Sequence, residues 1–113
     1  MLSGIYSAEF ASNKNVIGRG VAVFTGGTLH GEDASYYYKG KYRRDGNDNI
    51  SATIEVANHS GIPSSVFGPL KSFRLMLNGV ATNQGFTLSG QVEGQPTLLI
   101  TIALKKVDEL VEG

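Results

Sequence analysis

The sequence predicts an all-β protein of about eight antiparallel strands that close into a small up-and-down barrel. Apolar and polar residues alternate along most of the chain, the pattern of strands with one buried and one wet face. The turns between these runs are too short to contain the helices that connect parallel strands. With 113 residues the chain can form one hydrophobic core, so we expect a single domain over residues 1–113.

The first four strands are separated by turns rich in glycine, asparagine and aspartate. Tyr6, Ala8 and Phe10 share one face of the first strand, and the Gly26-Gly27 pair favours a hairpin turn after the second. In the fourth strand, tyrosines alternate with basic side chains. The expected ranges are 4–11, 17–25, 28–30 and 35–44, with a turn at Gly31, Glu32 and Asp33 after the third strand.

The second half begins after a turn at residues 45–48, with apolar residues recurring at period two from Ile50. Residues 58–72 contain two prolines, two glycines and four serines, so we expect an irregular segment that folds over a barrel opening as a lid or short helix. Asn78-Gly79 is a competing hairpin turn. The C-terminal tail is either a short helical turn or frayed. The expected strands are 50–56, 73–82, 86–93 and 97–107.

Composition argues against several functions. Ten basic residues balance ten acidic ones, which removes the field that non-specific nucleic-acid binding requires. Cysteine is absent, so disulfides and thiolate metal sites are excluded. The N-terminus lacks the pattern of a signal peptide, and no apolar run is long enough to form a membrane-spanning helix. We therefore expect a cytoplasmic protein that binds neither nucleic acid nor membrane.

Catalytic patterns are sparse. His30, Glu32 and Asp33 could form a metal cluster, but a polar turn explains the same three residues. The serines of residues 60–65 lack the strand, turn and helix that surround a nucleophilic serine in hydrolases. The sequence therefore predicts a protein that is not an enzyme and uses no metal or cofactor.

Three glycines, Gly40, Gly79 and Gly90, fall at positions that alternation assigns to the barrel interior. They either open a pocket or permit sharp strand bends at the corners of a small barrel. A pocket would make the protein a carrier or sensor of a small apolar molecule. The residues expected to line it are Phe10, Tyr38, Tyr42, Ile54, Phe73, Phe86 and Ile100.

Glycines and strand residues carry a resemblance to a known family, over residues 4 to about 92. The motifs are Gly4-Ile5-Tyr6-Ser7 with Phe10, Gly18 and Gly20, the Gly26-Gly27 hairpin, and Gly31-Glu32-Asp33 followed by Tyr38-Lys39-Gly40. With these motifs the chain resembles the GrlR-type negative regulators of bacterial type III secretion. The resemblance implies a lipocalin-like barrel that forms dimers and sequesters a transcriptional activator.

In that family an acidic run after the Tyr-x-Gly strand contacts the activator. The corresponding residues 43–49 keep two aspartates here, but two arginines precede them, so the local charge is about neutral. This version is expected to bind that partner weakly or to bind another. The expected partner-binding residues are Tyr37, which should be an exposed aromatic, Arg43, Arg44, Asp45 and Asp48.

Dimerisation has some support from apolar residues on the outward-facing positions of the strands. A group of exposed apolar side chains often marks an interface between protein molecules. The residues expected to be exposed are Val21, Val23, Met76 and Val80.

Overall fold

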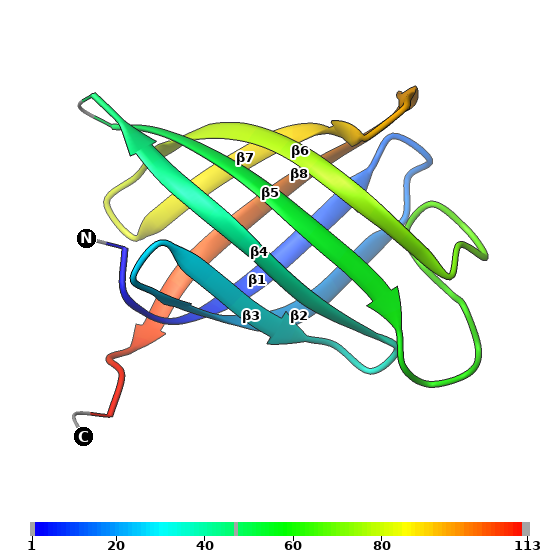
Figure 1. The fold of residues 1–113 in the computed structure, drawn as a ribbon, viewed down its shortest axis with the longest axis horizontal. Coiled ribbons are helices and arrows are strands. Elements are labelled where there is room, and N and C mark those ends of the chain that lie inside the picture. The colour runs from blue at the N-terminus through cyan, green and yellow to red at the C-terminus, as the bar shows by residue number, and fades with distance from the viewer. Residues whose placement is uncertain (1, 47, 112–113) are drawn as a thin grey trace.

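Eight antiparallel strands form a closed barrel in the computed structural model, which describes residues 2–46 and 48–111 (Figure 1). Each strand pairs with the next along the chain, and β1 pairs with β8 to close the sheet. The strands are β1 (Gly4–Ser12), β2 (Ile17–Thr25), β3 (Thr28–Glu32), β4 (Tyr36–Asp45), β5 (Asn49–Asn58), β6 (Ser72–Ala81), β7 (Gly85–Val92) and β8 (Gln95–Asp108). This order confirms the predicted fold class.

The structure corrects one local prediction and decides between the alternatives at two other places. The turn after the third strand begins later than expected, because Gly31 and Glu32 still pair with β2 and β4 and belong to β3. Gly79 is not part of a hairpin turn, since it pairs with Ile50 and Leu88 within β6. At the C-terminus, β8 continues to Asp108 and residues 109–111 are irregular, so the described part of the tail forms no helical turn. Glu112 lies outside the described residues.

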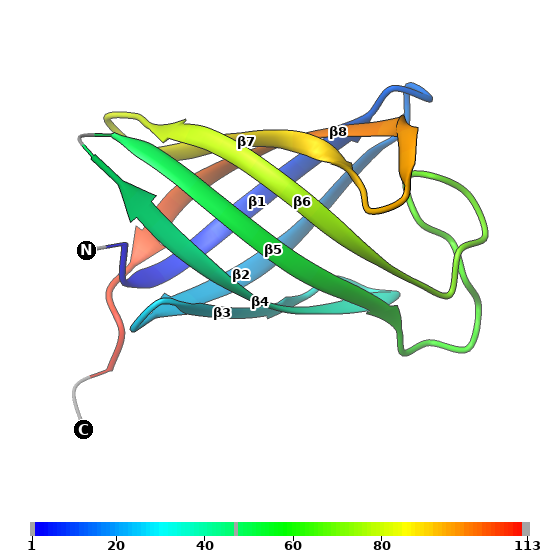
Figure 2. The same cartoon turned by 45° about the horizontal axis from the view of Figure 1, so that its top comes forward.

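The two ends of the barrel differ in what closes them. Both termini and the turn between β2 and β3 lie at one end, and the long connection between β5 and β6 lies at the other (Figures 1 and 2). At the end near the termini, an aromatic cluster fills the interior, with ring centroids 5.0–5.2 Å apart in edge-to-face contacts. The cluster consists of Tyr6, Phe24, Tyr42 and Phe86.

The interior glycines allow neighbouring strands to approach closely. A Cβ atom added to Gly79 would lie 1.7 Å from the carbonyl oxygen of Thr87, and one added to Gly40 would lie 2.3 Å from that of Thr53. At Gly90 the corresponding distance, to the carbonyl oxygen of a residue in β6, is 1.9 Å. Backbone rather than empty space occupies these positions. The structure therefore supports strand bending as the role of these glycines and contradicts their role in opening a pocket.

The connection between β5 and β6 closes the second end of the barrel as an irregular loop, which we call the β5–β6 loop (residues 59–71). Val66 and Phe67 are buried at its centre. The Ser12 hydroxyl donates a hydrogen bond of 2.6 Å to the carbonyl oxygen of Val66, which fixes the loop to β1. The side-chain amide of Asn58 donates to the carbonyl oxygen of Ser35, and this bond fixes the start of the loop to the turn after β3. The loop is thus a lid, as predicted, and contains no helix.

Candidate functional site

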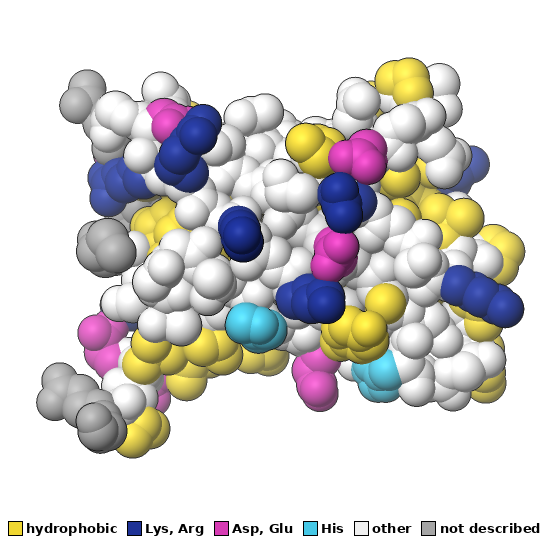
Figure 3. Space-filling model, viewed as in Figure 1, with side chains coloured by type: hydrophobic (Ala, Val, Ile, Leu, Met, Phe, Trp, Pro, Cys, Tyr) yellow, Lys and Arg dark blue, Asp and Glu magenta, His cyan; other side chains and the backbone are white. Residues whose placement is uncertain are grey.

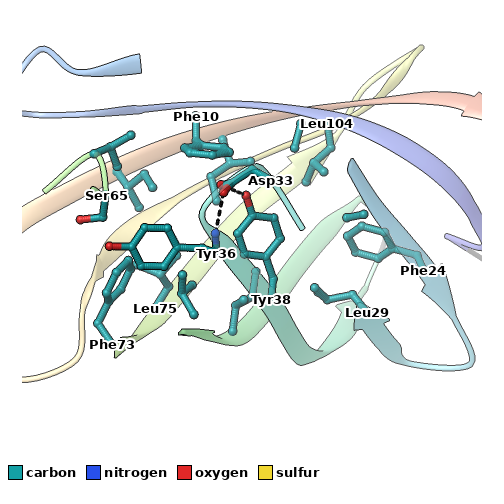
Figure 4. A pocket seen from close by; sticks show the side chains of 17 residues that line it. Phe10, Phe24, Leu29, Asp33, Tyr36, Tyr38, Ser65, Phe73, Leu75 and Leu104 are labelled. Atoms are coloured by element: carbon teal, nitrogen blue, oxygen red, sulfur yellow. Dashed lines mark hydrogen bonds between the residues drawn. The ribbon is translucent and has the colours of Figure 1, made fainter. Parts of the chain in front are cut away.

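A cavity of about 70 Å³ lies inside the barrel, between the aromatic cluster and the β5–β6 loop (Figure 4). Its wall is almost entirely apolar. The lining residues are Ala8, Phe10, Ala22, Phe24, Leu29, Asp33, Tyr36, Tyr38, Ile54, Val56, Ser65, Val66, Phe73, Leu75, Ile100, Ile102 and Leu104.

Five of the seven residues predicted for a cavity wall line this space, namely Phe10, Tyr38, Ile54, Phe73 and Ile100. The prediction is wrong for the other two. Tyr42 and Phe86 point inward, but they pack in the aromatic cluster at the opposite end of the barrel. Alternation indicates which face of a strand is buried, but it does not indicate the height of a side chain along the barrel axis.

Two alanines explain why space is left at this height. Ala8 of β1 and Ala22 of β2 are buried and line the cavity, whereas larger aromatic side chains occupy inward positions two residues away in each strand. Ala8 pairs with Gly20, but Gly20 does not line the cavity, because the Tyr38 side chain lies against it. Small inward residues on two adjacent strands are the signal in the sequence that identifies this part of the cavity.

Asp33 is one of the wall residues that alternation in the sequence does not assign to the cavity. One oxygen of its carboxylate accepts hydrogen bonds of 2.8 Å from the backbone N–H groups of Ser35 and Tyr36, and the other accepts from the Tyr38 hydroxyl (Figure 4). Burial raises the pKa of Tyr38, and the hydrogen bond to Asp33 and its negative charge raise this pKa further. Asp33 thus shapes the turn between β3 and β4 and places negative charge beside the cavity.

The metal hypothesis for His30, Glu32 and Asp33 finds no support. His30 and Glu32 are exposed on the outer face of β3, whereas Asp33 is half-buried and lines the cavity. Across residues 2–46 and 48–111, no three His, Asp or Glu side chains are grouped so that they could hold a metal ion. His30 and Glu32 lie within β3 and only Asp33 lies in the turn that follows, so the three residues do not form one polar turn either.

The remaining polar groups of the wall are the hydroxyls of Ser65 in the β5–β6 loop and Tyr36 in β4, and both donate hydrogen bonds to the loop backbone. The Ser65 hydroxyl donates to the carbonyl oxygen of Gly68 at 2.7 Å, and the Tyr36 hydroxyl donates to that of Leu70. Phe67 packs edge-to-face on Phe73, with ring centroids 5.6 Å apart. These contacts hold the loop against this end of the cavity.

The residues predicted to bind a partner do not form one continuous surface. Arg43 and Asp45 form an ion pair of 2.8 Å, and Arg44 and Asp48 form one of 3.3 Å. The loop between β4 and β5 therefore has its opposite charges paired with each other. Tyr37 is exposed as predicted, but six residues of extended strand, or about 20 Å, separate it from Arg43.

A row of alternating charges, not identified from the sequence, crosses the outer face of β4, β5 and β6 (Figure 3). Glu55 lies between Lys39 at 3.8 Å and Arg74 at 3.0 Å, and Arg74 also reaches Glu93 at 3.7 Å. All four side chains are about half exposed, so solvent screens the pairs and each adds little to stability. Cross-strand register, which the sequence does not specify directly, brings these residues together.

The apolar residues predicted at a dimer interface lie on opposite sides of the barrel. Val21, Met76 and Val80 are exposed, whereas Val23 is half-buried. The two valines at positions 21 and 23 belong to β2 and the other two residues to β6, and three strands separate β2 from β6 in either direction around the sheet. One flat interface cannot include both strands, so a dimer would use one of the two pairs.

No protein-family model matches this chain, and no curated protein sequence matches it. Among solved structures, the chain is similar to a redesigned β-barrel with a TM-score of 0.66. The match has 14% sequence identity and covers 95% of this chain and 92% of that chain. At this identity the likeness shows the fold alone. The resemblance to GrlR-type regulators therefore stays a prediction.

The described residues include no helix that is long and apolar enough to cross a membrane.

Proposed function

We propose that this protein is a non-enzymatic binding protein that holds a small apolar molecule inside its barrel. The observation that carries the proposal is the internal cavity of about 70 Å³ with its apolar wall. Well-packed interiors contain few voids larger than a water molecule, and a void in an apolar wall costs dispersion contacts. An apolar guest would restore those contacts without the desolvation penalty that a polar guest incurs.

The lid suits a protein that exchanges a guest. The β5–β6 loop is irregular, and side-chain contacts such as those of Ser12 with Val66 and of Tyr36 with Leu70 hold it over the cavity. Loops of this kind open more readily than strands in a closed sheet. An apolar cavity of about 150 Å³ accommodates benzene in another protein, so a guest of that size requires the lid to move outward here.

The test uses benzene as the probe and Ala8→Leu as the variant. Ala8 is buried against the cavity, so a leucine there fills the space that a guest would occupy. We expect benzene to shift the backbone amide resonances around the cavity and the β5–β6 loop in the unchanged protein, and to shift none of them in Ala8→Leu.

The matched control is Ala103→Leu, which adds the same atoms on the exposed outer face of β8. This variant should bind benzene as the unchanged protein does. Circular dichroism establishes that both variants are folded. Absence of benzene binding to the unchanged protein, or equal binding by Ala8→Leu, would contradict the proposed function.

A second candidate function, capture of a protein partner, is favoured by Tyr37, whose side chain is 43% exposed beside the charged row of β4–β6. Tyrosines are enriched at protein interfaces. The resemblance to GrlR-type regulators implies that the partner is a transcriptional activator and that the loop between β4 and β5 contacts it.

A double variant that carries both Asp45→Asn and Asp48→Asn tests this candidate function. Both side chains are exposed, so the double variant should keep its stability within about 0.5 kcal/mol. Pull-down from cells that produce the tagged protein should recover less of a stoichiometric partner with the double variant. Recovery equal to that of the unchanged protein would exclude the loop as the contact.

A further inference from the structure

The wall of the cavity includes an acidic side chain and no basic one. Among the residues that line it, Asp33 is acidic, and none is Lys, Arg or His. A buried anionic guest needs a cation or several hydrogen-bond donors to offset its lost hydration. The wall offers no cation for this purpose.

The donors on the wall are already used. The hydroxyl of Tyr38 donates to Asp33, that of Tyr36 donates to the carbonyl oxygen of Leu70, and that of Ser65 donates to the carbonyl oxygen of Gly68. The backbone N–H groups of Ser35 and Tyr36 donate to the Asp33 carboxylate. A carboxylate guest would have to break one of these bonds to gain a donor, and breaking a bond to Asp33 would leave two anions facing each other.

The Tyr38 hydroxyl illustrates why a second negative charge is unfavourable at this place. The pKa of the Tyr38 hydroxyl is raised, first by burial and then by the hydrogen bond and the charge of Asp33. Deprotonation of that hydroxyl and arrival of an anionic guest both add a negative charge near the same carboxylate. Both are opposed by the same desolvation and repulsion.

We infer that the cavity discriminates by charge, accepting uncharged molecules and rejecting carboxylates, and that Asp33 is the specificity-determining residue. This inference rests on the proposed binding function and deepens it by naming the guest's chemical class. Fatty acids and other organic acids are excluded. Compact hydrocarbons and their neutral derivatives are the expected class.

The test compares three probes of similar size, toluene, benzoate and benzylammonium, by titration at pH 7 with amide chemical shifts as the readout. We expect toluene to bind at least about tenfold more tightly than benzoate. Benzylammonium should fall between them, because its desolvation is unfavourable but its charge is attracted by Asp33.

Asp33→Asn removes the charge and keeps the shape of the side chain. In this variant benzoate should gain affinity relative to toluene, and benzylammonium should lose affinity relative to toluene. A purely structural role of Asp33 would not move the two ratios in opposite directions. Should Asp33→Asn not fold, Tyr38→Phe keeps the carboxylate and should retain the discrimination of at least about tenfold against benzoate.

The outcomes separate the two proposals. Failure of toluene to bind would overturn the proposed function. Binding of toluene together with equally tight binding of benzoate would overturn the charge discrimination alone. Unchanged ratios in a folded Asp33→Asn, or loss of the discrimination in Tyr38→Phe, would overturn the role of Asp33.

Discussion

Replacement of Phe24 by alanine should lower the free energy of unfolding by about 3–5 kcal/mol. The Phe24 side chain is 1% exposed and its ring packs against Tyr6, Tyr42 and Phe86 with centroid distances of 5.0–5.2 Å. These three neighbours belong to three different strands of a closed sheet, so they cannot collapse together into the space that the ring leaves. Urea denaturation followed by circular dichroism measures the loss.

Phe10→Ala is the matched control at the other end of the interior. Phe10 is half-buried and borders the existing cavity, and its ring centroid lies 6.2 Å from that of Tyr38. Its removal enlarges a space that is already present, so fewer contacts are lost, and the cost should be clearly smaller than that of Phe24→Ala. Equal losses for the two variants would mean that the aromatic cluster is not the better packed end of the barrel.

Binary patterning predicts most of the fold. Strand positions follow from period-two alternation because a one-residue error in register would turn every buried side chain toward water. Alternation alone assigns four residues between Ile50 and Val56 to the interior, and all four are buried. The pattern fails at Gly31, because a glycine in a paired strand is indistinguishable by sequence from a glycine in a turn.

The cavity is predictable in part. Inward residues such as Phe73 and Ile100 can be assigned to the wall, since their face is set by alternation. The position along the axis depends on strand tilt and stagger, which local sequence does not specify, and this is why the prediction for Phe86 is wrong. Asp33 joins the wall only through the register between β3 and β4, which brings Tyr38 opposite Gly31 and close to the turn.

Ion pairs on the surface are even harder to predict from the sequence. The neutral charge of the loop between β4 and β5 follows from composition, but the partition into Arg43 with Asp45 and Arg44 with Asp48 depends on side-chain geometry. Glu55 and Arg74 are 19 positions apart in the chain and meet because β5 and β6 pair in one register. Contacts of this kind can be predicted only when the pairing of the strands is known, and the sequence of one strand does not give it.

Replacement of Gly79 by alanine should destabilise the barrel by about 3 kcal/mol, equivalent to a fall on the order of 15 °C in Tm. The added methyl group would lie 1.7 Å from the carbonyl oxygen and 2.7 Å from the carbonyl carbon of Thr87. These are backbone atoms of β7, so relief requires the two strands to separate and weakens their hydrogen bonds. Thermal unfolding followed by circular dichroism measures the change.

Asn78→Ala isolates the effect, because it places an alanine one position earlier in β6 on the exposed outer face. Asn78→Ala should change the free energy of unfolding by no more than about 0.5 kcal/mol. A large difference between the two variants is then due to the inward direction of the methyl group added at residue 79. A Gly79→Ala protein as stable as Asn78→Ala would show that residue 79 borders open space. The interior glycines would then enlarge the pocket instead of bending the strands, and the cavity open to a guest would extend beyond the space next to Ala8 and Ala22.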